Sequence, residues 1–253
     1  MYAQERQQEI LRRARLAGRV DVVTLAEALA VTTETIRRDL TVLERAGVLR
    51  RVHGGAIPVE RLGFEPAVAA RDVVMTEEKE RIGKAALAEL PEDGAIIIDA
   101  GTTTGRLAEA IPADRELTVV VNSPPLATLL AGRANLTVIM LGGRVRGRTL
   151  ATVDDGALRP LSRLNVDVAF MGTNGCSPTR GLTTPDPAEA AVKRAMVEAA
   201  RRTVLLADHT KIGDIHFAAF ATLSDIDVVI TDTGLDDRMV AQLRAAGPEV
   251  VRA

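Results

Sequence analysis

The stretch VTTETIRRDL, residues 31–40, predicts a helix with one apolar and one polar face. Ile36, Leu40 and Leu43 recur at helical spacing and form the apolar face. At about 100° per residue, Arg38 points roughly away from that face. This layout is typical of a helix that reads the DNA major groove, because its N-terminal residues reach base edges while arginine binds guanine or phosphate. An ordinary surface helix fits the same pattern, so the flanking sequence must decide between the two.

The flanking residues predict the remainder of a helix-turn-helix. Residues 3–17 have the pattern of a first helix, and Thr24 can cap a second, shorter one. Thr32 or Thr33 can cap the third helix, which contains the quoted stretch and runs to Gly47. A helix, a short helix, a turn and a further helix follow one another in this motif. The flanks therefore favour a DNA-reading helix.

A two-stranded wing is predicted after the third helix. Residues 48–51 and 56–57 predict short strands, and the HGG sequence between them predicts a tight turn. Such a wing would place Arg50, Arg51 and His53 beside the phosphate backbone or the minor groove. For His53 alone, a turn histidine without a role is the simpler interpretation. The helix and the wing together predict these DNA-contacting residues: Thr33, Thr35, Arg37, Arg38, Arg51 and His53.

Three motifs in the N-terminal segment form a specific combination. TIRRDL, LERAGVLRR and HGGA occur in this order within residues 3–57. In this spacing they resemble the winged helix-turn-helix of the DeoR-type repressors of bacterial sugar metabolism. The resemblance implies a domain that binds double-stranded operator DNA in a sequence-specific way.

The composition is that of a globular protein whose positive charge is local. The 253 residues are 47% apolar and 26% charged, and the net charge is −2. Residues 1–60 hold ten arginines against eight acidic residues, whereas the remainder is net acidic. This balance argues against a non-specific DNA coat protein but not against a sequence-specific reader.

Cysteine content and hydropathy predict the compartment. Cys176 is the only cysteine, which excludes an intrachain disulfide and a cysteine-based zinc cluster. No apolar run reaches the length of a membrane span, and the N-terminus lacks the apolar region of a signal peptide. We therefore predict a cytoplasmic protein that has no metal site and no cofactor.

The chain is predicted to consist of a winged domain at residues 1–58, a linker at 59–75 and an effector-binding domain at 76–253. The linker region has prolines, a glycine, mixed charges and no clear period. From residue 95, short apolar runs alternate with helical segments, which predicts an α/β domain with a mostly parallel sheet covered on both faces. The predicted strands are 95–99, 118–121, 137–141, 166–171, 203–207, 228–231 and 249–251, and the helices are 104–110, 124–132, 186–201 and 235–246.

Polar residues after the predicted strands indicate one ligand site, because ligands bind beyond the carboxyl ends of parallel strands. DAGTTT, residues 99–104, combines a glycine, three hydroxyls and a helix start, which together can form a phosphate cradle. A threonine-rich helix cap without a ligand is the alternative. Cations at this edge would meet an anion, and carboxylates would bind sugar hydroxyls. The residues assigned to this site are Asp99, Gly101, Thr102, Thr103, Thr104, Asn122, Gly143, Arg144, Gly172, Lys193, Asp208 and Lys211.

The second half resembles the effector domain of the same repressors. The matching motifs, in order, are EKERIGKAAL, DAGTTT, VNSP, LGGRVR, DVAFMGTNG, GLTTPDPAEAAVKRAM and LADHTKIG. The resemblance implies a Rossmann-like fold related to ribose-5-phosphate isomerase and the glucosamine-6-phosphate deaminases, with a phosphorylated sugar as ligand. It adds Glu189, from EAAVKR, to the effector site. Ala100 departs from the pattern, since serine is common there, which puts the hydrogen-bond set of this loop in doubt.

These features predict a transcriptional repressor of a sugar-metabolism operon that binds DNA as a homodimer or homotetramer. The resemblance implies a small phosphorylated sugar as effector. Within the family, GLTTPDPAEAAVKRAMV most resembles regulators of fructose utilisation, which implies fructose 1-phosphate, although other members respond to glycerol 3-phosphate, tagatose phosphates or deoxyribose 5-phosphate. The helix in EKERIGKAAL would relay effector binding to the DNA-binding domain. The alternative is a sugar-phosphate isomerase or deaminase with an appended DNA-binding domain, in which Glu189, Asp208 and Lys211 would be acid–base groups.

Overall fold

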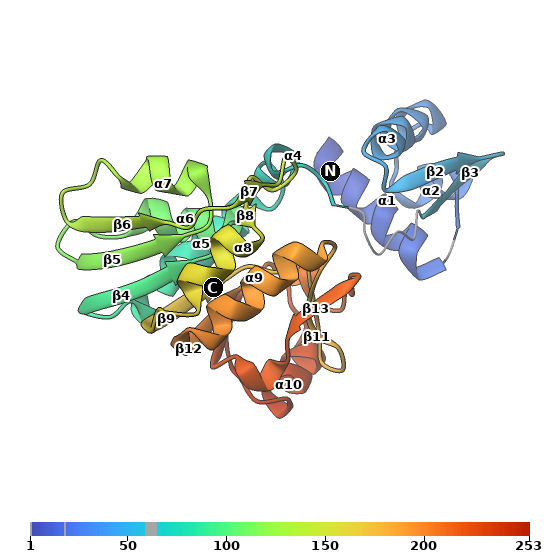
Figure 1. Cartoon of the computed structure of the whole chain (residues 1–253). Helices are drawn as coiled ribbons and strands as arrows, with labels where there is room; N and C mark the ends of the chain where they lie inside the picture. The colour runs from blue at the N-terminus through green and yellow to red at the C-terminus, as the bar shows by residue number, and fades with distance from the viewer. Residues whose placement is uncertain (1, 18, 59–64) are drawn as a thin grey trace. The chain divides into compact units, whose positions relative to one another are not determined.

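The computed structural model describes residues 2–17, 19–58 and 65–253 (Figure 1). The chain forms two compact units, Met1–Pro66 and Ala67–Ala253. Residues 59–64 of the predicted linker lie outside the described residues. A short helix, α4 (Val68–Asp72), forms within the remainder of that predicted linker, where the sequence showed no period.

The N-terminal unit is a winged helix-turn-helix. Buried aliphatic side chains of its three helices, among them Ile36 and Leu40, pack into one core together with Leu49 of the wing. The expected apolar face of the third helix is therefore confirmed. The elements are α1 (Ala3–Ala17), β1 (Val20–Asp21), α2 (Val22–Ala28), α3 (Thr33–Arg45), β2 (Leu49–Val52) and β3 (Gly55–Pro58), and the sheet order is β1-β3-β2.

The helix caps differ partly from prediction. Thr32 caps α3, and its hydroxyl accepts a hydrogen bond from the Thr35 backbone N–H (3.2 Å). The cap of α2 is Asp21 and not Thr24, because the Asp21 carboxylate accepts bonds from two N–H groups of the first turn, those of Val23 (2.9 Å) and Thr24 (3.3 Å). Thr24 itself lies inside the helix.

The second unit is built on a seven-stranded parallel sheet of order β15-β14-β12-β9-β4-β5-β6. All seven predicted strands are present, which confirms the α/β fold class. The strands are β4 (Asp93–Ile98), β5 (Glu116–Val121), β6 (Leu136–Met140), β9 (Val166–Met171), β12 (Ala200–Leu206), β14 (Val228–Thr231) and β15 (Glu249–Arg252).

Helices cover both faces of this sheet (Figure 1). In β4, Ile96 and Ile98 pack with α5, α6 and α7, whereas Ile97 packs with α8, α9 and α10. Alternate residues of a central strand are thus buried on opposite faces, which explains its continuous apolar sequence. The helices are α5 (Thr76–Ala85), α6 (Thr102–Ala110), α7 (Pro124–Leu130), α8 (Asp155–Leu161), α9 (Pro187–Glu198) and α10 (Asp237–Ala245).

Several short elements were not predicted. A second, three-stranded sheet has the order β10-β11-β13; its first two strands follow β9 and the third follows β12. A small hairpin, β7-β8, follows β6. Three-residue helices η2 (His209–Lys211) and η3 (Leu223–Asp225) also form. The bounds of the short strands are β7 (Arg144–Val145), β8 (Thr152–Val153), β10 (Gly175–Ser177), β11 (Gly181–Thr184) and β13 (Ala218–Ala221).

The strand order creates a switch point in the middle of the large sheet. From β4 the chain adds β5 and β6 on one side, and then β9, β12, β14 and β15 on the other. The direction of winding therefore reverses between β4 and β9. In open α/β sheets this reversal leaves a crevice at the carboxyl ends of the two strands, where ligands bind.

Candidate effector site and DNA-contacting surface

The polar face of α3 carries two exposed arginines. The Arg38 side chain is 82% exposed, and Arg37 is also exposed. Both lie within 4 Å of Glu34, at 3.6 Å for Arg37 and 3.9 Å for Arg38, and such exposed pairs contribute little to stability. The two guanidinium groups are therefore available for phosphate or base edges. Thr33 and Thr35, both half-buried, lie in the first turn of the same helix.

A buried carboxylate beneath this face holds α3 against α1. Asp39 accepts hydrogen bonds from Arg6 Nε (2.5 Å) and Gln7 Nε2 (2.9 Å). The Asp39 and Arg6 side chains are almost fully buried. Asp39 is part of TIRRDL, but the sequence did not indicate this role, because its partners are more than thirty positions away in the chain.

The wing arginine Arg51 lies against α3. Its guanidinium donates to the carbonyl of Arg37 (3.2 Å) and to the hydroxyl of Thr41 (3.3 Å). Its backbone N–H donates to Glu44 Oε1 (3.0 Å). This geometry directs the Arg51 side chain toward α3, and its predicted phosphate contact stays a prediction. Arg50 and His53 are exposed on the wing and its turn.

Four neighbouring strands of the large sheet end in predicted effector residues. Asp99 follows β4, Asn122 follows β5, Gly172 follows β9, and Asp208 lies two residues beyond β12. Because β12, β9, β4 and β5 are adjacent and parallel, their carboxyl ends lie along one edge. Directly at the switch point, the Gly172 N–H donates to Asp99 Oδ2 (3.0 Å).

The GTTT loop begins α6 at this edge. Gly101 is the N-cap residue in extended conformation, and no side chain caps the first N–H groups of the helix. The Thr104 hydroxyl donates within the loop, to the carbonyls of Asp99 (2.7 Å) and Gly101 (3.1 Å). Thr104 therefore shapes the loop, while Thr102 and Thr103 remain with the uncapped N–H groups as anion-binding candidates.

A buried ionic network lies behind the loop. Lys193 of α9 pairs with Asp99, donates to the Gly172 carbonyl (3.1 Å) and lies 3.9 Å from Glu189. Burial raises the pKa of Asp99, and the Lys193 ammonium opposes that rise. Glu189 in turn pairs with Arg146 and accepts a hydrogen bond from a threonine hydroxyl (3.0 Å). Asp99, Glu189 and Lys193 are thus brought together, but mainly as partners of one another.

Two buried polar atoms of this cluster have no hydrogen-bond partner in the described part of the chain. They are Oδ1 of Asp99 and Nδ2 of Asn122. Asn122 uses its other amide atom, Oδ1, to accept the backbone N–H of Ala100 (2.8 Å). One acceptor and one donor are therefore left unsatisfied beside the loop, which is unusual in a folded protein and typical of a site that a ligand completes.

In the LGGRVR motif, the predicted arginine is not the one that joins this network. Arg144 is exposed and pairs with Asp154 (2.8 Å), whereas Arg146 is the partner of Glu189. Gly143 has φ +113°, and a Cβ there would lie 2.1 Å from the Val153 carbonyl oxygen. Gly143 is therefore required by the β7-β8 hairpin, and the assignment of Arg144 and Gly143 to the effector site stays a prediction.

A lysine that the sequence did not single out lies near Asp208 and Lys211. Lys79 of α5 is buried, and its pKa is lowered to about 8 by burial, although the negative charge of Asp208 opposes this. Its ammonium donates to the carbonyls of Arg71 and Val74, both at 2.5 Å. Lys79 therefore links the neighbourhood of Asp208 to the C-terminal end of α4.

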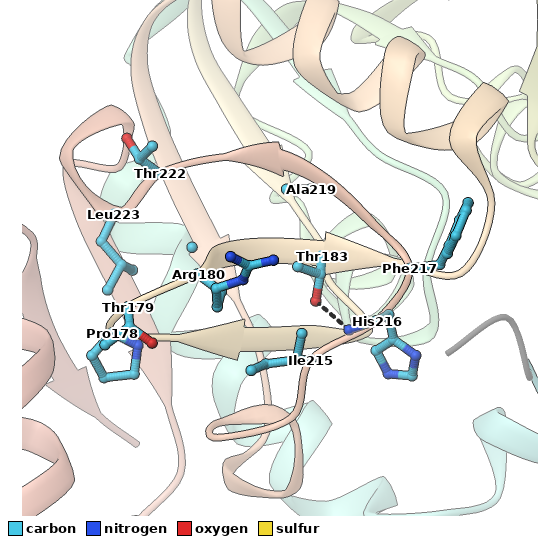
Figure 2. A pocket seen from close by; sticks show the side chains of 11 residues that line it. Pro178, Thr179, Arg180, Thr183, Ile215, His216, Phe217, Ala219, Thr222 and Leu223 are labelled. Carbon is cyan, nitrogen blue, oxygen red and sulfur yellow. Dashed lines mark hydrogen bonds between the residues drawn. The ribbon is translucent and has the colours of Figure 1, made fainter. Parts of the chain in front are cut away.

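A separate groove of about 380 Å³ lies on the small sheet (Figure 2). Its walls come from the β10–β11 turn, from residues 215–217 and from the end of β13. The His216 N–H donates to the Thr183 hydroxyl (2.9 Å) within it. None of the predicted effector residues lines this groove. The cavity and the strand-end site are therefore distinct features.

Both units match known families. The family described as DeoR-like helix-turn-helix domain matches residues 6–61, and the DeoR C terminal sensor domain matches residues 74–233. The HTH-type transcriptional regulator GlpR of Haloferax volcanii is 41% identical over 230 residues, covering 91% of this chain and 90% of the relative. The chain belongs to the DeoR family. This confirms the family predicted from the two sets of motifs.

Further relatives agree with this assignment. The HTH-type transcriptional repressor GlcR of Bacillus subtilis is 32% identical over 233 residues, which are 92% of this chain and 89% of that protein. Among solved structures, ribose 5-phosphate isomerase A from Neisseria gonorrhoeae is similar to 53% of this chain and 52% of its own, with a TM-score of 0.40 and 18% identity. A structural similarity of this size says nothing about the activity or the ligand of this chain.

This DeoR-family chain is a DNA-binding transcriptional repressor under the control of a sugar. Its curated relatives are regulators and not enzymes, so the alternative of an appended isomerase or deaminase is set aside. The family's sensor domain takes small sugar phosphates as effectors. Among the described residues, no helix is both long and apolar enough to cross a membrane.

Proposed function

We propose that this DeoR-family repressor binds its effector, a phosphorylated sugar, at the β4–β9 switch point, with fructose 1-phosphate as the first candidate. The phosphate is held by the N–H groups and hydroxyls at the start of α6, around Thr102 and Thr103. The observation that carries this assignment is the uncapped helix start beside two unpartnered buried atoms, Asp99 Oδ1 and Asn122 Nδ2. A sugar hydroxyl would satisfy both atoms, since it donates and accepts.

The DNA-binding half of the proposal rests on α3. Arg38 and Thr35 read base edges in the major groove, and Arg37, Thr33, Arg50 and His53 contact the backbone. Arg51 acts indirectly, by fixing the wing against α3. The protein binds its operator as a homodimer or homotetramer, because paired half-sites require paired helices. Light scattering during size-exclusion chromatography measures that state directly.

The effector signal passes through α5. Lys79 faces the charges of Asp208 and Lys211 and also caps the carbonyls of Arg71 and Val74, at the end of α4. A sugar phosphate near Lys211 would change the field at Lys79, and hence the position of α4, which leads toward the DNA-binding unit. Breaking α5 with Ala85→Pro would abolish effector-induced release from DNA. Release that survives this substitution would exclude the relay.

A dye-based thermal-shift assay tests the effector assignment. The panel holds fructose 1-phosphate, tagatose 6-phosphate, glycerol 3-phosphate and deoxyribose 5-phosphate, each beside its unphosphorylated parent. A ligand of the folded state raises the melting temperature by mass action. We expect one phosphorylated compound, and not its parent, to stabilise the protein, and Thr103→Ala to weaken that effect. Thr137→Ala, at an exposed threonine of β6, is the matched control. A panel that leaves the wild-type protein unshifted would contradict the proposal.

A further inference from the structure

Asp232 and His209 form a tight pair beyond the ends of β14 and β12, and β12 is the outermost of the four strands of the effector site on this side. Asp232 Oδ1 lies 2.7 Å from His209 Nδ1, and Oδ2 accepts the His209 backbone N–H (2.8 Å). The N–H of Gly234 adds a third bond to Oδ1 (2.8 Å). Asp232 is almost fully buried, whereas the His209 side chain is 34% exposed. One carboxylate therefore fixes both the ring and the backbone of His209.

The chemistry of the pair determines which nitrogen carries a proton. Burial raises the pKa of Asp232, but hydrogen bonds from His209 and from the Gly234 backbone outweigh it and lower the pKa to about 2. An ionised carboxylate only accepts hydrogen bonds, so His209 Nδ1 must be protonated. The hydrogen bond to Asp232 raises the pKa of His209 against the effect of burial, and the charges of Asp208 and Glu78 add to the rise. His209 is thus more often an imidazolium than a free histidine is.

The second ring nitrogen, Nε2, points to the opposite side of the ring from Asp232. Within residues 2–17, 19–58 and 65–253, it has no hydrogen-bond partner. The ring cannot easily turn, because it packs on Gly234, where a Cβ would lie 2.5 Å from Nδ1. His209 shares the η2 turn with Lys211 and follows Asp208 directly. The ring is therefore held by Asp232 on its Nδ1 side, is partly exposed, and belongs to a turn that carries two residues of the proposed effector site.

We propose that His209 binds the phosphate group of the sugar-phosphate effector through Nε2–H, and that Asp232 orients it. This inference rests on the proposed effector site. If His209 had only a structural role, connecting the end of β12 to the end of β14, its two hydrogen bonds to Asp232 would be sufficient. An imidazolium held by a buried carboxylate, with an unbonded second N–H in the same turn as Lys211, forms charge-assisted hydrogen bonds of the kind that recognise phosphate.

Two substitutions separate binding from structure. The amide nitrogen of asparagine occupies the place of Nδ1, so His209→Asn keeps the bond to Asp232 and loses the Nε2 donor. The amide nitrogen of glutamine reaches the place of Nε2, so His209→Gln keeps a neutral donor there and loses Asp232. Titration calorimetry of the full chain uses whichever of the four panel phosphates shifts the wild type most. We expect His209→Asn to bind at least tenfold more weakly at pH 7, with its unliganded melting temperature near that of the wild type, and His209→Gln to fall between.

The outcomes are distinct. A dissociation constant of His209→Asn within twofold of the wild-type value would overturn the inference. The proposed function would stand in that case, because the wild type still binds the sugar phosphate. A wild type that binds no panel phosphate would refute the proposed function and this inference with it. Inorganic phosphate, tested as a competitor of the sugar phosphate, shows whether His209 recognises the phosphate group. If His209→Asn weakens the sugar phosphate but not inorganic phosphate, Nε2 does not meet the phosphate and the proposal fails.

Discussion

The ammonium of Lys193 forms an ion pair with the carboxylate of Asp99, and both side chains are almost completely buried. The pair joins α9 to the end of β4, and the Gly172 carbonyl accepts a further hydrogen bond from the ammonium. Removing one member of a buried pair leaves the other charge uncompensated, which commonly costs about 3–5 kcal/mol. We expect Lys193→Met to lower the free energy of unfolding by that amount, measured by urea denaturation followed by circular dichroism.

The double substitution Asp99→Asn with Lys193→Met is the control for this prediction. It removes both charges, so it is expected to recover part of the stability that the single substitution loses. If the free energy of unfolding of Lys193→Met were within about 1 kcal/mol of the wild-type value, the prediction would be contradicted. Asp99 in that variant would then have to be protonated and uncharged, because burial raises its pKa once the Lys193 ammonium is gone.

The Asp232–His209 pair predicts a pH dependence of stability. The pKa of Asp232 falls from 3.8 to about 2 on folding, so its contribution of about 2 kcal/mol is present above pH 3.8 and is lost as the pH falls through 2. The pKa of His209 rises above 6.5, so its contribution is complete below 6.5 and is lost as the pH rises through the folded value. Both contributions coexist between about pH 4 and 6.5.

The measurement compares the wild type with Asp232→Asn at pH 3, 5 and 8. The difference in free energy of unfolding should be largest at pH 5 and smaller at both other values. Circular dichroism is the suitable probe, because the chain has no tryptophan and one tyrosine. A difference that does not vary with pH would mean that the pair contributes through shape and not through charge.

The large sheet was predictable because its inner strands are buried on both faces and therefore appear in the sequence as unbroken aliphatic runs. The small sheet was not, because strands such as Gly175–Ser177 are three or four residues long and carry glycine and hydroxyl residues that equally suit turns. Local chemistry predicted a cap of α3 at Thr32 or Thr33, and the structure has Thr32. The pattern did not indicate Asp21 as the cap of α2, because the helix begins at Val22, three residues before the start that a Thr24 cap implies.

The candidate site was predictable only to the level of strand ends. Topology brings Asp99, Asn122, Gly172 and Asp208 to one edge, and their polar nature marks them in the sequence. The pattern could not tell which charges pair with one another. It singled out Arg144 as an anion ligand and did not indicate that Arg146 pairs with Glu189. Such pairings depend on loop paths, which residue spacing does not specify.

Asp39 predicts a link between packing and DNA binding. Its carboxylate joins α3 to Arg6 and Gln7 of α1, and the Arg6 pair is mostly buried. Asp39→Ala would leave the Arg6 guanidinium without its partner and should destabilise the N-terminal unit by about 3 kcal/mol. Amide hydrogen exchange reports this as faster exchange in α1 and α3 and unchanged exchange in the large sheet. Uniform exchange changes across both units would contradict a local role.

The two arginines Arg38 and Arg51 provide a matched test of the DNA surface. Arg38 is 82% exposed and makes only a long pair with Glu34, so Arg38→Ala should leave stability within about 0.5 kcal/mol. If it reads a base edge, the loss of specific affinity should be about 1–3 kcal/mol, roughly 5- to 150-fold.

In contrast to Arg38→Ala, Arg51→Ala should lower the stability of the N-terminal unit and leave the sequence specificity of DNA binding unchanged. It removes hydrogen bonds to the Arg37 carbonyl and Thr41, so it should destabilise the N-terminal unit by about 1–2 kcal/mol. Fluorescence anisotropy with a duplex selected from a random pool, competed by a scrambled duplex, measures specificity. Arg38→Ala should lower the ratio of specific to non-specific affinity, because a base contact is sequence-dependent. Arg51→Ala should weaken both duplexes alike. If instead Arg51→Ala alone reduced that ratio, the wing and not α3 would carry the sequence-specific contact.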